Sequence, residues 1–302
     1  MRFFVSLLCV AILFSCGVFS EFRGDVSGLP ALQILGIAQD AGRPQLNCKK
    51  DCCRALIARG VSHPVASLAI VGDSGWWLVD ATPDIVEQIH SMGSMPHGIF
   101  LTHGHMGHYT GLMQLGFESM NADRVPVYCS RSMAGYLRHN APWSQLVDME
   151  QIILREVDEG VAVVLEKDLQ VVPYSVRHRA EHTNTFAWNI ERANGRRALW
   201  LPDLDKWLDD GSDLRFFASE FDYLFIDGTF FSREELPLRG LDEIPHPLIG
   251  DSMKILEEGF SAKVYFIHLN HSNPVWDRSS WQFQTLRDKG FFVPNLGQRF
   301  SL

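Results

Sequence analysis

The sequence predicts a mixed α/β protein with more than one β-sheet. The chain has 302 residues, of which 46% are hydrophobic and 21% charged, an ordinary globular composition. After the first 26 residues, eleven short apolar runs rich in β-branched and aromatic residues recur, most of them bounded by turn residues. Helical patterns separate some runs and tight turns separate others, so parallel and antiparallel pairs are both expected.

The predicted elements follow one another without repeats or long linkers. Pro83 suits the start of the first helix, and Asn194-Gly195 predicts a hairpin because that pair tolerates a positive φ. The expected strands are Leu32–Ala38, Ser67–Gly72, Trp76–Ala81, Gly98–Thr102, Val125–Ser130, Val161–Leu165, Leu169–Val176, Thr185–Glu191, Arg197–Asp203, Tyr223–Asp227 and Val264–Leu269. The expected helices are Asp84–Met92, His108–Met120, Ser132–His139 and Ser279–Lys289.

The N-terminus has the pattern of a secretory signal peptide, residues 1–20. Arg2 precedes an apolar run that is too short to span a bilayer, and small residues follow it. Cleavage after Ser20 would release a soluble protein, whereas a lipobox-like pattern before Cys16 would leave a lipid-attached, membrane-bound form. Both predict export, to the periplasm or the outer membrane in a bacterium and to the outside otherwise. Residues 27–302 are expected to form a single domain.

Three cysteines, Cys48, Cys52 and Cys53, cluster in the segment NCKKDCC. In an oxidising compartment the cluster suits a disulfide from Cys48 to one of the other two. Clustered thiolates also suit a small structural zinc site, for which His63 is a candidate fourth ligand. The sequence leaves both interpretations open.

The segment LTHGHMGH places three histidines within six positions after an apolar run. His103 and His105 alternate onto the same side of an extended chain, and a turn near Gly107 would bring His108 over the same spot. Three converging imidazoles form a metal site, and imidazole suits zinc, iron, manganese or copper.

Other polar residues follow apolar strands in the same way, which predicts that one rim of the molecule carries a site. They are Asp80, His178, His182, Asp203, Asp227, His268 and His271.

These motifs resemble those of the metallo-β-lactamase superfamily, whose HxHxDH motif matches this segment with Gly107 in place of the aspartate. The resemblance implies a four-layer αββα sandwich of two mixed β-sheets, with metal ions at one edge between the sheets. It implies that Asp80 orients the histidine loop and that His268, rather than His271, is a ligand, with His271 next to the ligands or facing substrate. The implied ligands are His103, His105 and His178 for one ion, and His108, Asp203 and His268 for the second, with Asp203 bridging.

Within that superfamily the chain resembles the pyrroloquinoline-quinone (PQQ) synthesis protein B family. Four segments carry this resemblance in the same order, namely LGIAQDAGRPQLNCKKDCC, FIDGTFFSREEL, IPHPLIGDSM and IHLNHSNP. That family's central motif is itself degenerate, whereas this chain keeps His103 and His105. Gly107 either weakens the second metal site or leaves room for substrate or for a replacement ligand such as His182.

The function expected from these features is that of an exported metal-dependent hydrolase with one or two divalent ions, zinc above iron or manganese. A metal-activated hydroxide would attack an ester, lactone, amide or phosphodiester. Asp203, His182 or His246 would relay the proton, and Asp227 is a further candidate near the metals. The alternatives are an iron-dependent oxidative enzyme like the PQQ synthesis relatives, or a non-catalytic metal- or substrate-binding scaffold.

The partners expected from composition are limited. The formal net charge of −9 argues against nucleic acid, because phosphate binding requires a basic surface. A small-molecule substrate is expected, and the sequence does not indicate an oligomeric state.

Overall fold

The computed structural model describes residues 30–302, apart from 180, 194, 237–244 and 258. The predicted signal peptide and Cys16 lie outside the described residues. Within the described ranges, no helix is long and apolar enough to span a lipid bilayer.

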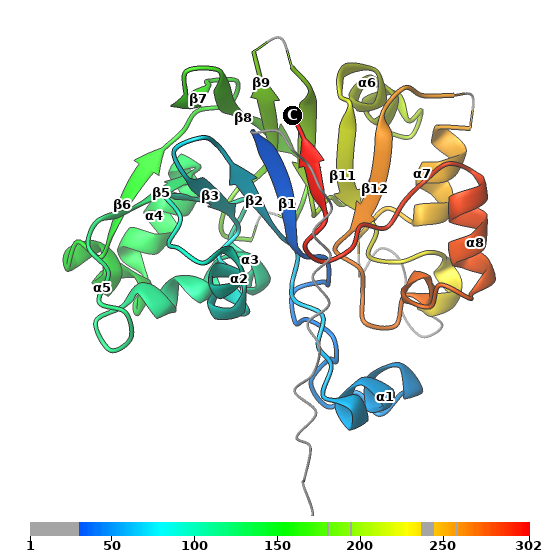
Figure 1. Ribbon diagram of the computed structural model, residues 1–302, viewed down its shortest axis with the longest axis horizontal. Helices are drawn as coiled ribbons and strands as arrows, with labels where there is room; N and C mark the ends of the chain where they lie inside the picture. Colours follow the sequence, from blue (N-terminus) through cyan, green and yellow to red (C-terminus); the bar gives the residue numbers. More distant parts are fainter. Residues whose placement is uncertain (1–29, 180, 194, 237–244, 258) are drawn as a thin grey trace, which may run out of the picture.

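The first β-sheet has seven strands in the order β13-β1-β2-β3-β4-β5-β6 (Figure 1). Strands β13 to β3 pair antiparallel, whereas β3 to β6 pair parallel, so the sheet is mixed. Its members are β1 (Ala31–Gly36), β2 (Ser67–Val71), β3 (Trp76–Val79), β4 (Ile99–Phe100), β5 (Val125–Cys129), β6 (Ile152–Glu156) and β13 (Arg299–Ser301). Sequence patterns missed β6, which ends in charged residues, and β13, which is three residues long.

The second sheet has six strands in the order β12-β11-β10-β9-β8-β7. Strands β10, β11 and β12 are parallel, and the others pair antiparallel, including the predicted hairpin of β9 and β10. Its members are β7 (Val163–Glu166), β8 (Leu169–Val176), β9 (Thr185–Arg192), β10 (Arg197–Leu201), β11 (Tyr223–Asp227) and β12 (Lys263–Ile267). Two mixed sheets confirm the predicted fold class.

Helices cover the outer faces of both sheets. Figure 1 shows α2 to α5 beside the first sheet and α6 to α8 beside the second. The α-helices are α1 (Asp51–Arg59), α2 (Ile85–Met92), α3 (Met106–Tyr109), α4 (Arg131–His139), α5 (Trp143–Asp148), α6 (Ser212–Glu220), α7 (Ile249–Ile255) and α8 (Trp281–Asp288). Short 3-10 helices occupy Thr110–Leu115, Arg233–Glu235 and Pro274–Trp276.

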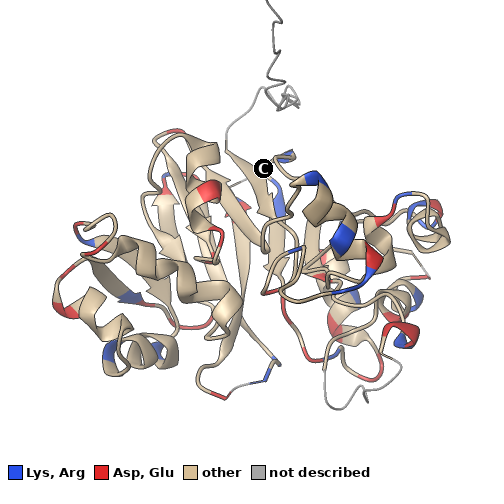
Figure 2. Cartoon of the chain, turned by 90° about the horizontal axis from the view of Figure 1, so that it is seen from below, with Lys and Arg blue, Asp and Glu red and all other residues tan. Residues whose placement is uncertain are grey.

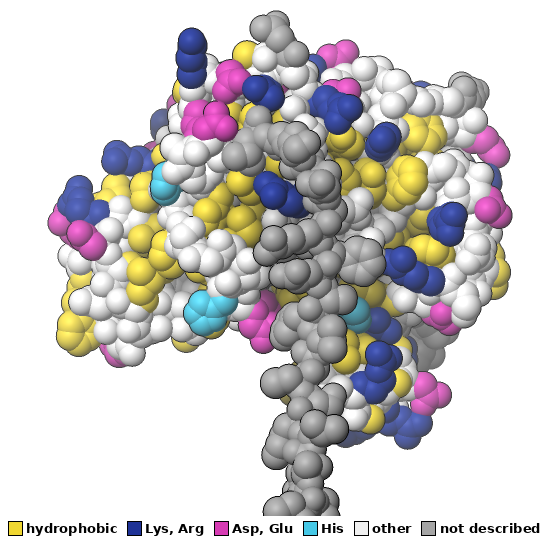
Figure 3. Space-filling view, in the orientation of Figure 1, with side chains coloured by type: hydrophobic (Ala, Val, Ile, Leu, Met, Phe, Trp, Pro, Cys, Tyr) yellow, Lys and Arg dark blue, Asp and Glu magenta, His cyan; other side chains and the backbone are white. Residues whose placement is uncertain are grey.

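Alternation of side chains along the strands divides the interior into two hydrophobic cores. On β1, Leu32 and Ile34 belong to a core that lies between the sheets and continues under α6 to α8, whereas Leu35 joins a core under α2, α4 and α5. The charged residues lie mainly on the outer loops and helices (Figure 2). On the visible part of the face in Figure 3, apolar side chains form several separate areas among charged ones. The core between the two sheets, with helices on their outer faces, confirms the predicted four-layer αββα arrangement.

The expected helix His108–Met120 is wrong in its extent. The structure has a single turn of α-helix, α3, followed by a 3-10 helix. The N–H of Gly111 donates to the carbonyl of Ala81 at 2.9 Å, which ties the chain to the end of β3. This tertiary contact outweighs the local helical pattern.

Carboxyl ends of parallel strands meet at one edge of the molecule and supply most of the polar residues singled out in the sequence. Asp80 follows β3, Asp203 follows β10 and His268 follows β12. Asp80 and His268 have φ of 65° and 56°, a left-handed conformation that residues with a side chain rarely adopt. Such conformations cluster at functional sites.

The core between the sheets yields a test of stability. Phe225 on β11 is fully buried, and its ring lies 5.0 Å from that of Phe300 on β13, so it joins the two sheets. Phe225→Ala should lower the free energy of unfolding by about 3–5 kcal/mol, as for other buried aromatic residues. Phe216→Ala is the matched control, since Phe216 is 52% exposed, and it should cost less than about 1 kcal/mol. Equal losses in urea unfolding would contradict this account of the core.

Candidate metal centre

One buried carboxylate, that of Asp203, lies among four imidazoles at the edge between the sheets. Its Oδ2 lies 3.3 Å from Nε2 of His103, 3.5 Å from Nε2 of His108, 3.4 Å from Nε2 of His178 and 3.6 Å from Nε2 of His268. His103 comes from the loop after β4 and His108 from α3, while His178 follows β8 and His268 follows β12. Both sheets therefore contribute to a single cluster.

Several atoms at this centre are buried and have no hydrogen-bond partner among the described residues. They are Nε2 of His103, His108 and His268, Oδ1 of Asp203 and Oδ1 of Asp40. A buried polar atom left without a partner costs about 1–3 kcal/mol. Divalent ions bind imidazole nitrogen and carboxylate oxygen, so a metal would satisfy these atoms. The residues present fit a metal centre.

The other ring nitrogen of each imidazole has a polar neighbour, and in His103, His108 and His268 a hydrogen bond to that neighbour fixes the direction of Nε2. The Nδ1 atoms of His103, His108, His178 and His268 lie 2.9 Å from Thr102 Oγ1, 2.8 Å from Asp80 Oδ2, 3.0 Å from Asp205 Oδ1 and 3.0 Å from Thr229 Oγ1, respectively. Asp80 also accepts from the N–H of Thr102 at 2.8 Å. The structure thus places Asp80 where the superfamily resemblance implied that it orients the histidine loop.

His105 differs from the other imidazoles. Its Nδ1 faces Nε2 of His178 at 3.0 Å, and its Nε2 lies 3.0 Å from the carboxylate of Glu181. The two facing ring nitrogens are both ligand atoms available to one ion.

Burial and charge set the protonation of the centre. Burial lowers the pKa of His103 well below its usual value, which keeps this imidazole neutral and able to bind a metal. Burial would likewise lower the pKa of His108, but Asp80, Asp203 and Asp40 raise it well above that value. Burial would raise the pKa of Asp203, but its imidazole neighbours, His268 and His178 foremost, hold it well below the usual range. A bound cation would replace the proton on His108.

Three groups of candidate ligands share Asp203. The first contains His103, His105, His178 and Asp203, and the second contains Asp40, His108, Asp203 and His268. The third contains Asp203, Asp227, His246 and His268. Within each group the ligand atoms lie within 4.8 Å of one another. The first two groups correspond to the sets implied by the resemblance, with Asp40 added to the second.

Asp40 is the residue that sequence reasoning missed. Burial would raise the pKa of its carboxyl group, but contacts with the imidazoles of His108 and His268 hold that pKa well below its usual range. Asp40 follows the apolar run Leu32–Ala38, so the rule that found the other candidates at strand ends also applies to it.

The remaining candidates divide between the centre and other places. His246 lies at the centre, with Nδ1 2.8 Å from Asp227 Oδ2 and 3.3 Å from Asp203 Oδ1. Burial would lower the pKa of His246, but Asp227 and Asp203 raise it to about 9. His182 lies apart from these ligand groups and stacks on Tyr136, with ring centroids 5.4 Å apart.

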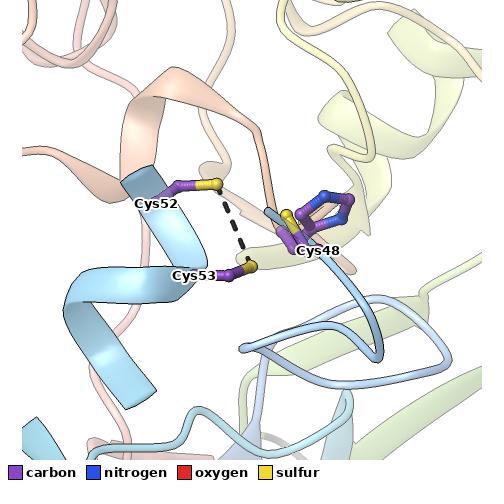
Figure 4. Close-up of side chains that lie close together, drawn as sticks. Cys48, Cys52 and Cys53 are labelled. Carbon is purple, nitrogen blue, oxygen red and sulfur yellow. Dashed lines mark hydrogen bonds between the residues drawn. The ribbon is translucent and has the colours of Figure 1, made fainter. Parts of the chain in front are cut away.

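The three clustered cysteines form a second candidate metal site. Cys48, Cys52 and Cys53 point toward one another at the start of α1 (Figure 4), and the fourth ligand atom within 4.8 Å belongs to His271. His271 thus lies beside the cysteines and not at the Asp203 centre. His63, the expected fourth ligand, packs against Trp276 with ring centroids 4.7 Å apart. Three thiolates and one imidazole are a common donor set for structural zinc.

The cysteines are free thiols in this structure, and the Sγ atoms of Cys52 and Cys53 lie 3.9 Å apart. Burial raises the pKa of the Cys53 thiol to about 11, so this thiol is protonated at neutral pH unless a cation binds.

Comparison with known proteins identifies the family. Residues 75–269, more than half of the chain, match the Beta-lactamase superfamily domain. The chain therefore belongs to the β-lactamase superfamily and has its metallo-β-lactamase fold. It is similar to Coenzyme PQQ synthesis protein B of Methylococcus capsulatus, at 26% identity over 310 residues that cover 90% of this chain and 99% of that protein. The same protein of Methylobacterium sp. is 27% identical over 303 residues, covering 89% of this chain and 99% of its own.

Solved structures agree with this fold. The crystal structure of Zn²⁺-bound PqqB from Methylobacterium extorquens superposes with a TM-score of 0.75 at 22% identity, covering 90% of this chain and all of that one. A diphosphatase of the PhnP family superposes with a TM-score of 0.63 at 21% identity, covering 89% of this chain and 96% of that one.

The cysteine cluster gives a test by metal content. Cys48→Ser should lower the zinc bound per chain by one ion, measured by mass spectrometry of metals after dialysis against zinc. Cys129→Ala is the matched control, because Cys129 is buried under α4, in a different core, and its loss should leave zinc content unchanged. Zinc affinity at this site should fall as pH falls, since protons compete for the thiolates. Equal zinc content in Cys48→Ser and wild type would contradict a zinc site.

Proposed function

We propose that this protein is a metal-dependent hydrolase that binds two divalent cations at the edge between its sheets. The observation that carries the proposal is the shared carboxylate: Asp203 belongs to three overlapping groups of candidate ligands, among them the two sets that would hold the ions. Adjacent sites joined by one carboxylate are typical of two-metal hydrolytic centres. Membership of the β-lactamase superfamily supports the same reaction class.

A bound divalent ion supplies hydroxide at neutral pH, because it lowers the pKa of water from 15.7 to about 7, and it polarises the oxygen of the group under attack. Zinc suits the mixture of imidazole and carboxylate donors best, and iron or manganese also suits it. The substrate expected is a small molecule with an ester, lactone, amide or phosphodiester bond.

The protein's own residues perform two tasks at the ions in this proposal. His103, His105 and His178 would hold one ion, and His108 and His268 would hold the other, with Asp203 shared by both sets. Asp80 keeps the imidazole of His108 in the tautomer that leaves Nε2 free to bind.

His246 is the candidate that would move a proton. Its Nδ1 is engaged by Asp227, which leaves Nε2 to exchange a proton with the leaving group. A cation bound at Asp203 would offset the carboxylates and bring the pKa of His246 down from about 9 toward neutrality. His182 is exposed and lies outside these ligand groups, so it is a weaker candidate.

The hydrolase proposal predicts turnover without oxygen that depends on Asp203. Wild type loaded with zinc or manganese should hydrolyse at least one class in a panel of aryl esters, lactones, amides and phosphodiesters under argon. Asp203→Asn keeps the shape of the side chain but removes its charge, and should lower metal content at the Asp203 centre and reduce kcat/KM by at least 100-fold, about 2.7 kcal/mol. His139→Ala, an exposed histidine on α4, is the control and should match wild type. Absence of metal from saturated wild type would overturn the proposal.

An oxidative reaction is the second candidate, favoured by similarity to Coenzyme PQQ synthesis protein B over 90% of the chain. The second ligand group, with two imidazoles and carboxylates, also suits non-haem iron. This candidate would be selected if turnover required both iron and oxygen and if no turnover occurred under argon. Metal binding without turnover, either under argon or with iron and oxygen, would favour the third hypothesis, a non-catalytic metal- or substrate-binding scaffold.

The role of His246 has its own test. If His246 protonates the leaving group, His246→Gln should slow substrates with poor leaving groups, such as alkoxides, by about 100-fold or more, and substrates with good leaving groups, such as nitrophenolates, far less. Metal content should stay close to that of wild type. Equal loss for both substrate types would assign His246 a positioning role instead.

A further inference from the structure

Gly107 stands where the superfamily motif has an aspartate, and the structure shows what occupies that space. A Cβ atom on residue 107 would lie 2.5 Å from the Cα of Asp40 and 2.9 Å from its Cβ, and it would overlap Oδ1 of the same residue. Real Cβ atoms do not approach other atoms this closely. Asp40 therefore fills the volume that a side chain at position 107 would need.

The carboxylate of Asp40 faces the second group of candidate ligands. Its Oδ1 lies 3.3 Å from Nε2 of His108 and 3.7 Å from Nε2 of His268. All three of these atoms are buried and lack a hydrogen-bond partner among the described residues. Unpartnered buried nitrogens that face an unpartnered carboxylate oxygen are the arrangement a cation would complete.

Backbone pairing holds Asp40 in this position. The N–H of Gln39 donates to the carbonyl of Leu269 at 3.0 Å, and the N–H of Leu269 donates to the carbonyl of Ile37 at 2.8 Å. The residues before Asp40 are thus bonded directly to the residue after His268. The two side chains that face one another come from adjacent, hydrogen-bonded segments.

We propose that Asp40 is a ligand of the second metal ion, in place of the missing motif aspartate, and that Gly107 is required because only a residue without a side chain lets Asp40 approach. This inference rests on the proposed metal centre. In this chain, the segment after β1 supplies the carboxylate of the second site, whereas in the superfamily motif the histidine loop supplies it. Restoring aspartate at position 107 should therefore displace Asp40 and weaken the site, although the sequence motif alone suggests a gain.

The experiment uses full-length protein and Mn²⁺, an ion that thiolates bind poorly, so that the cysteine cluster does not interfere. Titration calorimetry should detect two Mn²⁺ ions in wild type. Asp40→Asn, which preserves shape, should weaken the second ion at least tenfold and leave the first unchanged. Gly107→Ala adds no charge and changes no ligand, yet it should weaken the second ion to a similar degree.

Two further variants make the result specific. The double variant Asp40→Asn with Gly107→Ala should be no worse than either single variant, because both remove the same interaction. Gly135→Ala on α4 is the control, since a Cβ there meets nothing within 4 Å, and it should bind both ions as wild type does. Circular dichroism on each variant separates loss of metal from loss of fold.

The outcomes distinguish this inference from the proposed function. Two ions in wild type with unchanged affinity in Asp40→Asn would overturn the role of Asp40 and leave the metal centre in place. A gain of affinity in Gly107→Asp would overturn the steric requirement for glycine. A wild type that binds no Mn²⁺, Zn²⁺ or Fe²⁺ would overturn the metal centre and the role of Asp40 together.

Discussion

The arrangement of the candidate metal centre, at the edge between the two sheets, depends on one buried charge, the carboxylate of Asp203. Its side chain is 1% exposed, and removing a carboxylate from water costs several kcal/mol unless partners surround it. Those partners are imidazoles from segments attached to both sheets, at 3.3–3.6 Å from Oδ2. Asp203 and its neighbours therefore join the two sheets at one edge, beside the hydrophobic core that lies between the sheets.

Holding the imidazoles around this charge requires an unusual backbone. Asp80 and His268 adopt positive φ at the ends of β3 and β12, and such residues cost about 1–3 kcal/mol each. Hydrogen bonds compensate in both places: Asp80 accepts from the N–H and the hydroxyl of Thr102, and Thr229 Oγ1 lies 3.0 Å from Nδ1 of His268. The same bonds that stabilise the strained residues orient the rings. Local strain and ligand geometry thus have one structural cause.

The sequence predicted the parts of this arrangement that are written in local patterns. Apolar runs ending in a polar residue predicted most strands, and the resemblance to the metallo-β-lactamase superfamily implied the ligand sets. It did not predict β6 or β13, because a strand ending in charged residues and a three-residue strand lack a clear alternation. Asp40 was missed although it follows an apolar run as the other candidates do, and its closeness to Gly107, 67 positions away in the chain, arises only in the folded backbone. The contact of His271 with the cysteine cluster was not predicted either, since spacing alone does not fix where a loop residue points.

The two candidate metal sites share the segments that support them. Asp40 and the cysteines lie on the chain between β1 and the first turns of α1, while His268 and His271 lie three residues apart after β12. Arg43 links these segments, because its Nε donates to the carbonyl of His271 at 3.1 Å and its guanidinium lies 4.7 Å above the ring of Trp276. Apart from Cys52 and Cys53 at the start of α1, the candidate ligands of these two segments lie outside regular strands and helices, so side chains and backbone hydrogen bonds help to fix their relative position. An ion held by Cys48, Cys52, Cys53 and His271 would add four bonds to that connection. It would therefore stabilise the approach of Asp40 to His268 without touching either residue.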